Sequence, residues 1–342
     1  MPVNVYPWHQ TARDALLQRR GLLPHALLFV GREGTGKLNF VRALAQSVLC
    51  ATPAADGVAC GSCQGCRWFV ARAHPDYREI QPEALLPPEE QEISGTERKP
   101  SRQITIDQVR ALADFMNLSA HTGGPKLVVI SPAEALNANA ANSLLKCLEE
   151  PPGTTRFMLV SHRPGSLPST IISRCQKVTL PDATGAEAKQ WLQGQGVVDA
   201  GLRLAYAGNA PLAALDLDET EFWEQRKIVL DALCAPRLKV IALAERIQKC
   251  PAPRLLSWLV RWSYDLMIIQ AAQRVRYNPD YERSLAQLAG RLAPAAIARF
   301  YRHLMSEQRT VQHPLNARLH IERLLLAYSQ LLRGEREFGH VD

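Results

Sequence analysis

The chain has 342 residues, which is too long for one ordinary hydrophobic core and leads us to expect two or three domains. Its hydrophobic fraction of 46% is typical of a globular protein, and no apolar run reaches the ~18 residues that a membrane helix needs. The net charge of +7 permits a nucleic-acid partner but does not require one. The N-terminus lacks a basic segment followed by an apolar one, so we expect a cytoplasmic protein with no membrane partner.

A glycine-rich loop follows the first predicted strand. Ala26–Val30 is a short apolar run of the kind that a buried parallel strand needs, and residues 38–49 have the apolar spacing of a helix. Between them, residues 31–37 fit the phosphate-binding pattern G-x-x-x-x-G-K, and the candidate nucleotide-binding residues are Gly31, Gly34, Thr35, Gly36 and Lys37. Magnesium-binding loops continue with Ser or Thr, whereas this chain has Leu38, which cannot bind a metal. We predict a degenerate P-loop that binds nucleotide weakly or not at all; a glycine-rich turn without a ligand is the alternative.

Four of the eight cysteines lie within one short segment, with the spacing C-x9-C-x2-C-x2-C. They are Cys50, Cys60, Cys63 and Cys66. Thiolates at this spacing can surround one tetrahedral ion, and disulfides are disfavoured in a reducing cytosol, so we interpret the segment as a structural zinc site. An iron–sulfur cluster also uses four thiolates and is the alternative.

A third interpretation makes the cysteine segment a zinc-dependent nucleic-acid binder. The basic and aromatic residues around it are few, namely Arg67, Trp68, Phe69 and Arg72. Such a set offers sparse contacts to bases and phosphates, so we expect the metal to hold the fold together and not to read DNA.

Buried strands alternate with helices as far as residue 180. A polar, Pro-rich stretch at residues 82–102 is interpreted as a surface loop. The apolar patterns after it predict a helix at 104–117, a strand at 126–130, a helix at about 133–150, a strand at 156–161, a short helix at 168–172 and a strand at 177–180. Such alternation indicates a parallel sheet covered by helices on both faces, the α/β class.

Beyond residue 180 the pattern becomes entirely helical. Residues 184–216 predict two short helices around Ala207-Gly208-Asn209, and longer amphipathic helices follow at 223–233, 238–248, 255–274, 281–291, 294–307 and 314–332. The last residues, 334–342, are polar and are expected to fray. We divide the chain into an α/β domain at 1–180 that contains the cysteine module at 50–66, a small helical domain at 181–216, and an all-α domain at 217–342.

The acidic pair of a working ATPase is missing from its expected place. P-loop ATPases carry Asp-Glu after the strand that follows the loop's helix, where the Asp organises Mg²⁺ and the Glu activates water. Here the strand at 126–130 is followed by Ser131 and Pro132, which can do neither task. Glu134 lies at the predicted start of a helix, and we interpret it as a cap. We expect no intrinsic hydrolysis; the alternative, an active ATPase motor, would have to bind magnesium through Thr35.

Several segments together closely resemble the bacterial clamp-loader AAA+ family. They are the four-cysteine segment, residues 24–28, His74-Pro75-Asp76, residues 142–152 and Ser173-Arg174-Cys175. The resemblance covers residues 1 to about 216 by motif, and the rest by length and helical character only. It implies an AAA+ P-loop domain, a small helical lid domain and a C-terminal helical collar that joins a ring of subunits.

The resemblance also implies roles for particular residues. The family presents the arginine of its Ser-Arg-Cys motif to ATP held by a neighbouring gamma or tau motor subunit, and this role falls on Arg174 as an arginine finger in trans. The alternative for Arg174 is a salt bridge that holds the end of the strand. Ser161 stands where the family has its first sensor residue, and no sensor arginine follows Gly208.

In that family, ATP binding lets the delta subunit open a sliding beta clamp, and the complex then places the clamp on primed DNA during DNA replication. The resemblance implies that this chain is the comparatively rigid subunit of the complex, its stator. It also implies membership of a DNA polymerase III holoenzyme, a DNA-directed DNA polymerase, without a polymerase active site in this chain. The expected partners are gamma/tau and delta, with the clamp and primed DNA bound through the complex.

Overall fold

A computed structural model describes residues 3–87, 100–217, 220–308 and 317–334. Most of the predicted surface loop and of the polar tail, at 88–99 and 335–342, lies outside the described residues. The chain divides into two compact units, Met1–Glu187 and Ala188–Asp342. The division of the chain into three domains therefore stays a prediction. No described helix combines the length and the apolar character that crossing a membrane requires.

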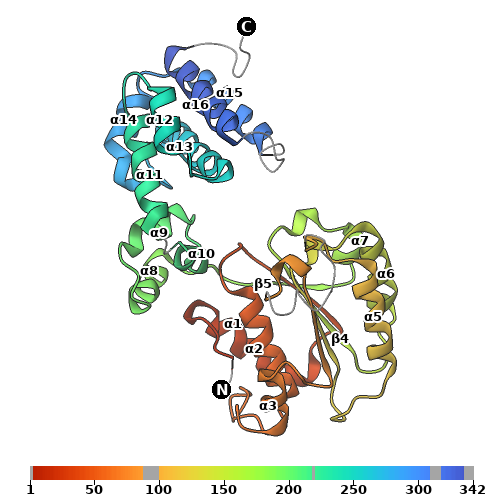
Figure 1. Ribbon diagram of the computed structural model, residues 1–342. Coiled ribbons are helices and arrows are strands. Elements are labelled where there is room, and N and C mark those ends of the chain that lie inside the picture. Colours follow the sequence, from red (N-terminus) through yellow and green to blue (C-terminus); the bar gives the residue numbers. More distant parts are fainter. Residues whose placement is uncertain (1–2, 88–99, 218–219, 309–316, 335–342) are drawn as a thin grey trace. The chain divides into compact units, whose positions relative to one another are not determined.

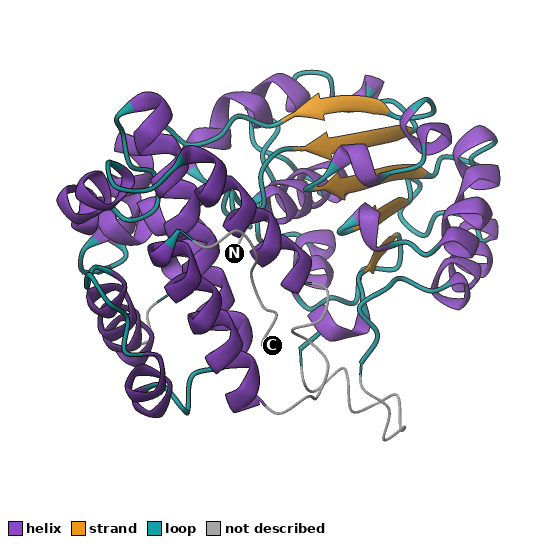
Figure 2. Ribbon diagram, turned by 90° about the horizontal axis from the view of Figure 1, so that it is seen from above, coloured by secondary structure: helices purple, strands orange, loops and turns teal. Residues whose placement is uncertain are grey.

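The first unit is built on a five-stranded parallel sheet with the strand order β2-β3-β4-β1-β5 (Figure 2). Its strands are β1 (Ala26–Val30), β2 (Tyr77–Ile80), β3 (Leu127–Ile130), β4 (Arg156–Ser161) and β5 (Gln176–Thr179). In the register, Ala26 pairs with Phe157 and Leu27 pairs with Gln176. The predicted parallel sheet is confirmed, and all its strands end at the same edge.

The strands alternate their side chains between two cores, as the pleat requires. Leu28 and Val30 pack in one core with helices α5 (Ile106–Asn117), α6 (Ala138–Glu149) and α7 (Ser169–Ile172). Leu27 and Phe29 pack in the other with α1 (Gln10–Leu17) and α2 (Lys37–Leu49), and α3 (Gln64–Val70) lies beside α2. Figure 1 shows helices α1 and α2 on one side of the sheet and α5 and α6 on the other. This three-layer arrangement confirms the predicted α/β class.

The helix predicted at about 133–150 is two separate elements. A short 3-10 helix, η4 (Ala133–Ala135), follows β3, and α6 begins only at Ala138. Asn137 has extended backbone angles, and its side chain accepts a hydrogen bond from the Ala140 amide, which caps α6. The predicted start was wrong because the apolar spacing continues across this cap. The remaining 3-10 helices of this unit are η1 (Pro7–His9), η2 (Arg20–Leu22), η3 (Glu83–Leu85) and η5 (Pro164–Ser166).

From α8 (Gly185–Gly194) onward the described chain is helical. The next helices are α9 (Ala200–Tyr206) and α10 (Pro211–Leu215), so three helices occupy the region where two were predicted. The longer helices then follow as α11 (Thr220–Leu233), α12 (Val240–Arg246), α13 (Ala252–Ala272), η6 (Pro279–Tyr281), α14 (Glu282–Ala289), α15 (Pro294–Glu307) and α16 (Ala317–Arg333). Helix α13 packs against α14, α15 and α16, with Trp258 and Trp262 fully buried. The predicted all-helical character is confirmed.

Candidate functional site

The phosphate-binding loop joins the end of β1 to the start of α2. Gly34 and Gly36 adopt positive φ angles of 73° and 90°, which glycine reaches without steric cost. Gly36 precedes the first turn of α2, and Lys37 is the first helical residue. The structure therefore brings Gly31, Gly34, Thr35, Gly36 and Lys37 into one loop at the carboxyl edge of the sheet, as predicted.

The polar groups of this loop bond to the loop itself. The Lys37 ammonium and the Thr35 hydroxyl both donate to the Arg32 carbonyl, the latter at 2.9 Å. Both side chains are buried, with relative exposures of 2% for Lys37 and 1% for Thr35. Burial lowers the pKa of the Lys37 ammonium to about 8. The Thr35 hydroxyl is thus engaged and buried, which counts against its use for magnesium by an ATPase motor.

An aromatic pair from the N-terminal segment covers the loop. The Tyr6 and Trp8 rings stack with centroids 5.1 Å apart, and the Trp8 indole nitrogen donates to the Thr35 carbonyl at 2.9 Å. The Tyr6 hydroxyl accepts from the Asn39 amide at 2.9 Å. A Cβ at Gly36 would lie 2.2 Å from the Tyr6 ring, so this position has room for glycine only. This contact was not predicted, and its one signal in the sequence is the pair of aromatic residues ahead of the first strand.

Ser131 and Glu134 lie in the region where a working ATPase carries its acidic pair. β3 ends at Ile130, and Ser131 after it is buried. Glu134 lies in η4, where its Oε1 accepts from the backbone amides of His162 and Arg163 at 2.9 and 3.1 Å. Burial opposes the ionisation of Glu134, but backbone amides, including that of His162, bring its pKa below the usual value. Glu134 lies in the first turn of η4, at a helix start as predicted, and its carboxylate also caps the loop after β4.

Arg174 lies just after α7, at the corner that leads into β5. Its Nη1 donates to the Thr170 carbonyl at 2.9 Å and to the Ser173 hydroxyl at 3.3 Å. Its Nη2 forms an ion pair with Glu149, the last residue of α6. Both side chains are partly exposed, 33% for Arg174 and 49% for Glu149. In the chain by itself, Arg174 therefore forms a salt bridge, which was the alternative to the finger role. The sequence did not indicate Glu149 as its partner.

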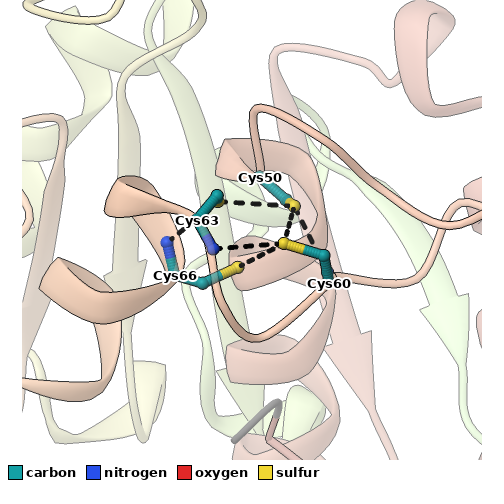
Figure 3. A group of neighbouring side chains, drawn as sticks. All are labelled: Cys50, Cys60, Cys63 and Cys66. Atoms are coloured by element: carbon teal, nitrogen blue, oxygen red, sulfur yellow. Dashed lines mark hydrogen bonds between the residues drawn. The ribbon is translucent and has the colours of Figure 1, made fainter.

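The four cysteines predicted as metal ligands converge on one point (Figure 3). Their sulfur atoms all lie within 4.8 Å of one another. Cys50 Sγ is 3.6 Å from Cys60 Sγ and 3.8 Å from Cys63 Sγ, and Cys60 Sγ is 4.0 Å from Cys66 Sγ. Four sulfurs around a zinc ion at ~2.3 Å define a tetrahedron with edges of ~3.8 Å. The arrangement therefore fits one tetrahedral ion with no position left for water or substrate.

Hydrogen bonds favour the thiolate at Cys60, whereas burial raises the pKa of the Cys50 and Cys66 thiols. The Cys60, Cys63 and Cys66 amides donate to the sulfurs of Cys50, Cys60 and Cys63, respectively, at 3.3 to 3.4 Å. The Thr52 hydroxyl, together with the Ser62 and Cys63 amides, lowers the pKa of the Cys60 thiol to about 5. Metals bind the thiolate form, so the donors around Cys60 prepare this one ligand for an ion.

The His74-Pro75-Asp76 segment has a structural role in this fold. The Asp76 carboxylate is buried and accepts from the His121 and Thr122 amides at 2.7 and 2.9 Å and from the Thr122 hydroxyl at 2.7 Å. Nδ1 of His74 accepts from the Asp76 amide at 3.1 Å. These bonds tie the start of β2 to the loop before β3.

Comparison with known proteins assigns the chain to a family. Residues 14–184 match the family described as DNA polymerase III, delta subunit, and residues 220–330 match DNA polymerase III, delta subunit, C terminal. The chain is 34% identical over 340 residues to DNA polymerase III subunit delta' of Pseudomonas aeruginosa, which covers 96% of this chain and 98% of that protein. The subunit delta' of Escherichia coli is 30% identical over 339 residues, covering 96% and 95%.

More distant likenesses are weaker and carry no part of the assignment. DNA polymerase III subunit tau of Bacillus subtilis is 30% identical over 168 residues, which is 49% of this chain and 26% of that protein. The solved structure of a DNA polymerase III gamma subunit-related protein from Thermotoga maritima has a TM-score of 0.45 at 16% identity, over 94% of this chain and 99% of that chain. The assignment therefore rests on the sequence matches over nearly the whole chain. By those matches, the chain belongs to the delta-prime subunit family of bacterial DNA polymerase III.

Proposed function

We propose that this chain is the stator of a clamp loader, which does not hydrolyse ATP and lends Arg174 to an ATP site on a neighbouring gamma or tau subunit. The observation that carries the proposal is the difference in exposure between two cationic side chains of the first unit, Lys37 and Arg174. The Lys37 ammonium is buried and bonded to its own loop, whereas the Arg174 guanidinium lies at a partly exposed corner. A cation can stabilise a neighbour's phosphate only if it can reach that phosphate.

The present partner of Arg174 can be exchanged at low cost. Ion pairs between partly exposed side chains contribute only ~0.2–1 kcal/mol, so the Glu149 carboxylate holds the guanidinium weakly. The γ-phosphate of ATP carries more negative charge than one carboxylate and accepts the planar, bidentate guanidinium well. An arginine supplied in trans stabilises the charge that develops on this phosphoryl group, which is worth ~10³–10⁵ in rate. Glu149 then serves to hold Arg174 near its working position until a neighbour binds.

We propose further that the four cysteines hold one structural zinc ion. Sulfur–sulfur distances of 3.6 to 4.0 Å support a single central ion. In a four-iron cluster each thiolate binds a different iron, so the sulfurs have to spread around the cluster. When bound, the ion cross-links the end of α2 to the start of α3. The chain's own residues contribute the thiolates and the amide donors that stabilise them.

The partners follow from the same proposal. The gamma or tau subunit supplies the ATP site that faces Arg174, and delta completes the complex that opens the sliding beta clamp. The helical second unit supplies the surface for assembly into a ring, and the clamp and primed DNA are bound through the complex. The polymerase reaction then belongs to other subunits of the holoenzyme.

The test is Arg174→Ala in the complex reconstituted from purified subunits. We expect assembly at the normal stoichiometry by size-exclusion chromatography, together with loss of much of the DNA-stimulated ATP turnover. Arg110→Ala removes an exposed arginine of α5 and is the matched control, which should turn over ATP as the wild type does. Unchanged turnover in the Arg174→Ala complex would contradict the finger assignment. Vigorous magnesium-dependent hydrolysis by the isolated chain would instead support an ATPase motor.

A further inference from the structure

A cavity lies at the edge of the sheet opposite the phosphate-binding loop. It has a volume of about 630 Å³, within the range of small-ligand sites. Because all strands are parallel, the loop at the end of β1 and the residues that precede the strands lie at opposite edges. The cavity is lined by η2, by the end of α2, by α3, by residues 121–125 before β3 and by Arg156, the first residue of β4. Sequence reasoning could not assemble these walls, because they come from five separate segments.

Two arginines give the cavity its positive charge. Nη2 of Arg20 donates to the Val48 and Cys50 carbonyls at 2.9 and 2.8 Å, and Arg156 donates to the Arg20 and Gly21 carbonyls at 3.1 and 3.3 Å. Within the described parts of the chain neither guanidinium has a carboxylate partner, and the lining contains no acidic residue. A guanidinium has five N–H donors, so each arginine keeps donors that these carbonyls do not use.

An indole ring adds a flat surface to the same cavity. Trp68, on α3, is partly exposed and belongs to the lining. The rings of His74 and His121 approach it at steep angles of 89° and 64°, with centroids 5.9 and 5.8 Å away. Among the described residues no aromatic ring stacks parallel to the indole.

We propose that this cavity binds single-stranded DNA, with a base stacked on Trp68 and backbone phosphates bound by Arg20 and Arg156. Stacking of bases on aromatic rings, combined with basic residues along the backbone, is the general mode of sequence-independent single-strand binding. An acidic peptide would satisfy the two guanidiniums but would leave the indole without a flat partner, whereas a nucleotide satisfies both. The site lies beside the cysteine module but draws its arginines from η2 and β4, and it does not depend on Arg174.

The experiment measures fluorescence anisotropy of a labelled oligothymidylate of about 20 nucleotides, longer than the ~4–16 that one binding module covers. The purified full chain should bind it at low salt. Trp68→Ala should weaken binding by about 5- to 150-fold, the range for loss of one stacked base. Trp68→Phe keeps a stacking ring and should retain most of the affinity. Arg156→Gln should weaken binding and reduce the slope of log affinity against log salt by about 0.7, the value for one phosphate.

The control for charge is Arg291→Gln, which removes an exposed arginine after α14 and should bind as the wild type does. Circular dichroism melting curves should show that all variants are folded. The proposal is overturned if Trp68→Ala and Arg156→Gln bind like the wild type, if Arg291→Gln weakens binding as much as they do, or if the wild type binds polyglutamate but no oligonucleotide. Arg174→Ala should bind the oligonucleotide normally, so the finger proposal and this one fail separately.

Discussion

The phosphate-binding loop and the Arg174 corner are two cationic sites of one unit with opposite exposure. In the loop, the ammonium of Lys37 is buried and the Tyr6 ring lies against Gly36. At the corner, Arg174 is partly exposed and held by the single carboxylate of Glu149. The first cation must leave a packed environment before it can meet a phosphate, and the second needs only to exchange one weak partner. On the proposed function, exposure more than motif distinguishes the cation that acts on a nucleotide.

Between the phosphate-binding loop and the Arg174 corner, the largest effect is expected on the loop's side, from removing a ligand of the proposed zinc ion. This ion would hold the end of helix α2, which starts at Lys37 and is followed directly by Cys50. Zinc bound by four thiolates contributes ~10–16 kcal/mol, whereas whole domains are stable by only ~5–15 kcal/mol. We therefore expect Cys63→Ser to lose its cooperative thermal transition, and the wild type to yield one zinc per chain by metal analysis.

The control for that prediction is Cys147→Ser on α6, outside the cluster, which should keep both the zinc and the transition. A Cys63→Ser protein that melts like the wild type would show that the cysteine module carries no structural ion.

A smaller perturbation tests the cover over the loop. Gly36→Ala should lower the free energy of unfolding by about 2–5 kcal/mol, because φ is 90° and the new Cβ would overlap the Tyr6 ring. In a Tyr6→Ala background the overlap is gone, so the same change should cost less, as a double-mutant cycle by urea denaturation will measure. Gly123 also has a positive φ, at 71°, but a Cβ added there would meet no atom within 4 Å. Gly123→Ala therefore measures the free-energy cost of the backbone conformation alone. Equal costs of Gly36→Ala in both backgrounds would argue against the packed cover.

The burial of Lys37 predicts a dependence of stability on pH. Its pKa is about 8 in the folded chain against 10.5 for the ordinary side chain, so between these values the unfolded state binds more protons. Stability should therefore rise with pH from about 8 to 10.5, by about 1–3 kcal/mol. The difference in unfolding free energy between the wild type and Lys37→Met removes the contribution of other titrating groups. A difference that stays constant over this range would mean that the ammonium is solvated.

The smallest effect on stability is expected at the Arg174 corner. Glu149→Gln removes an ion pair between partly exposed side chains and should cost only about 0.2–1 kcal/mol of stability, less at high salt. Glu150→Gln is the matched control, because it removes the neighbouring exposed charge without an ion pair to Arg174. A loss of several kcal/mol of stability in Glu149→Gln but not in Glu150→Gln would show that Glu149 binds Arg174 too tightly for it to contact a neighbouring subunit.

The framework of the fold was predictable from sequence because apolar runs such as Ala26–Val30 are unambiguous buried strands. Strand β2 was missed because Tyr77–Ile80 is short, polar and at the sheet edge, where one side needs no partner. The cysteine ligands were predictable because their spacing is local. The Tyr6 contact with Gly36 and the Glu149 partner of Arg174 were not, since they join segments about 30 and 25 residues apart through tertiary packing.

The central claim is tested most directly by comparing two variants of this chain in the reconstituted clamp loader. DNA-stimulated ATP turnover should fall sharply with Arg174→Ala, because the neighbouring ATP site loses its ~10³–10⁵ contribution. Turnover should stay at the wild-type rate with Lys37→Met, because the proposed function gives the phosphate-binding loop of this chain no part in hydrolysis. The opposite result, with Lys37 required and Arg174 dispensable, would contradict the account.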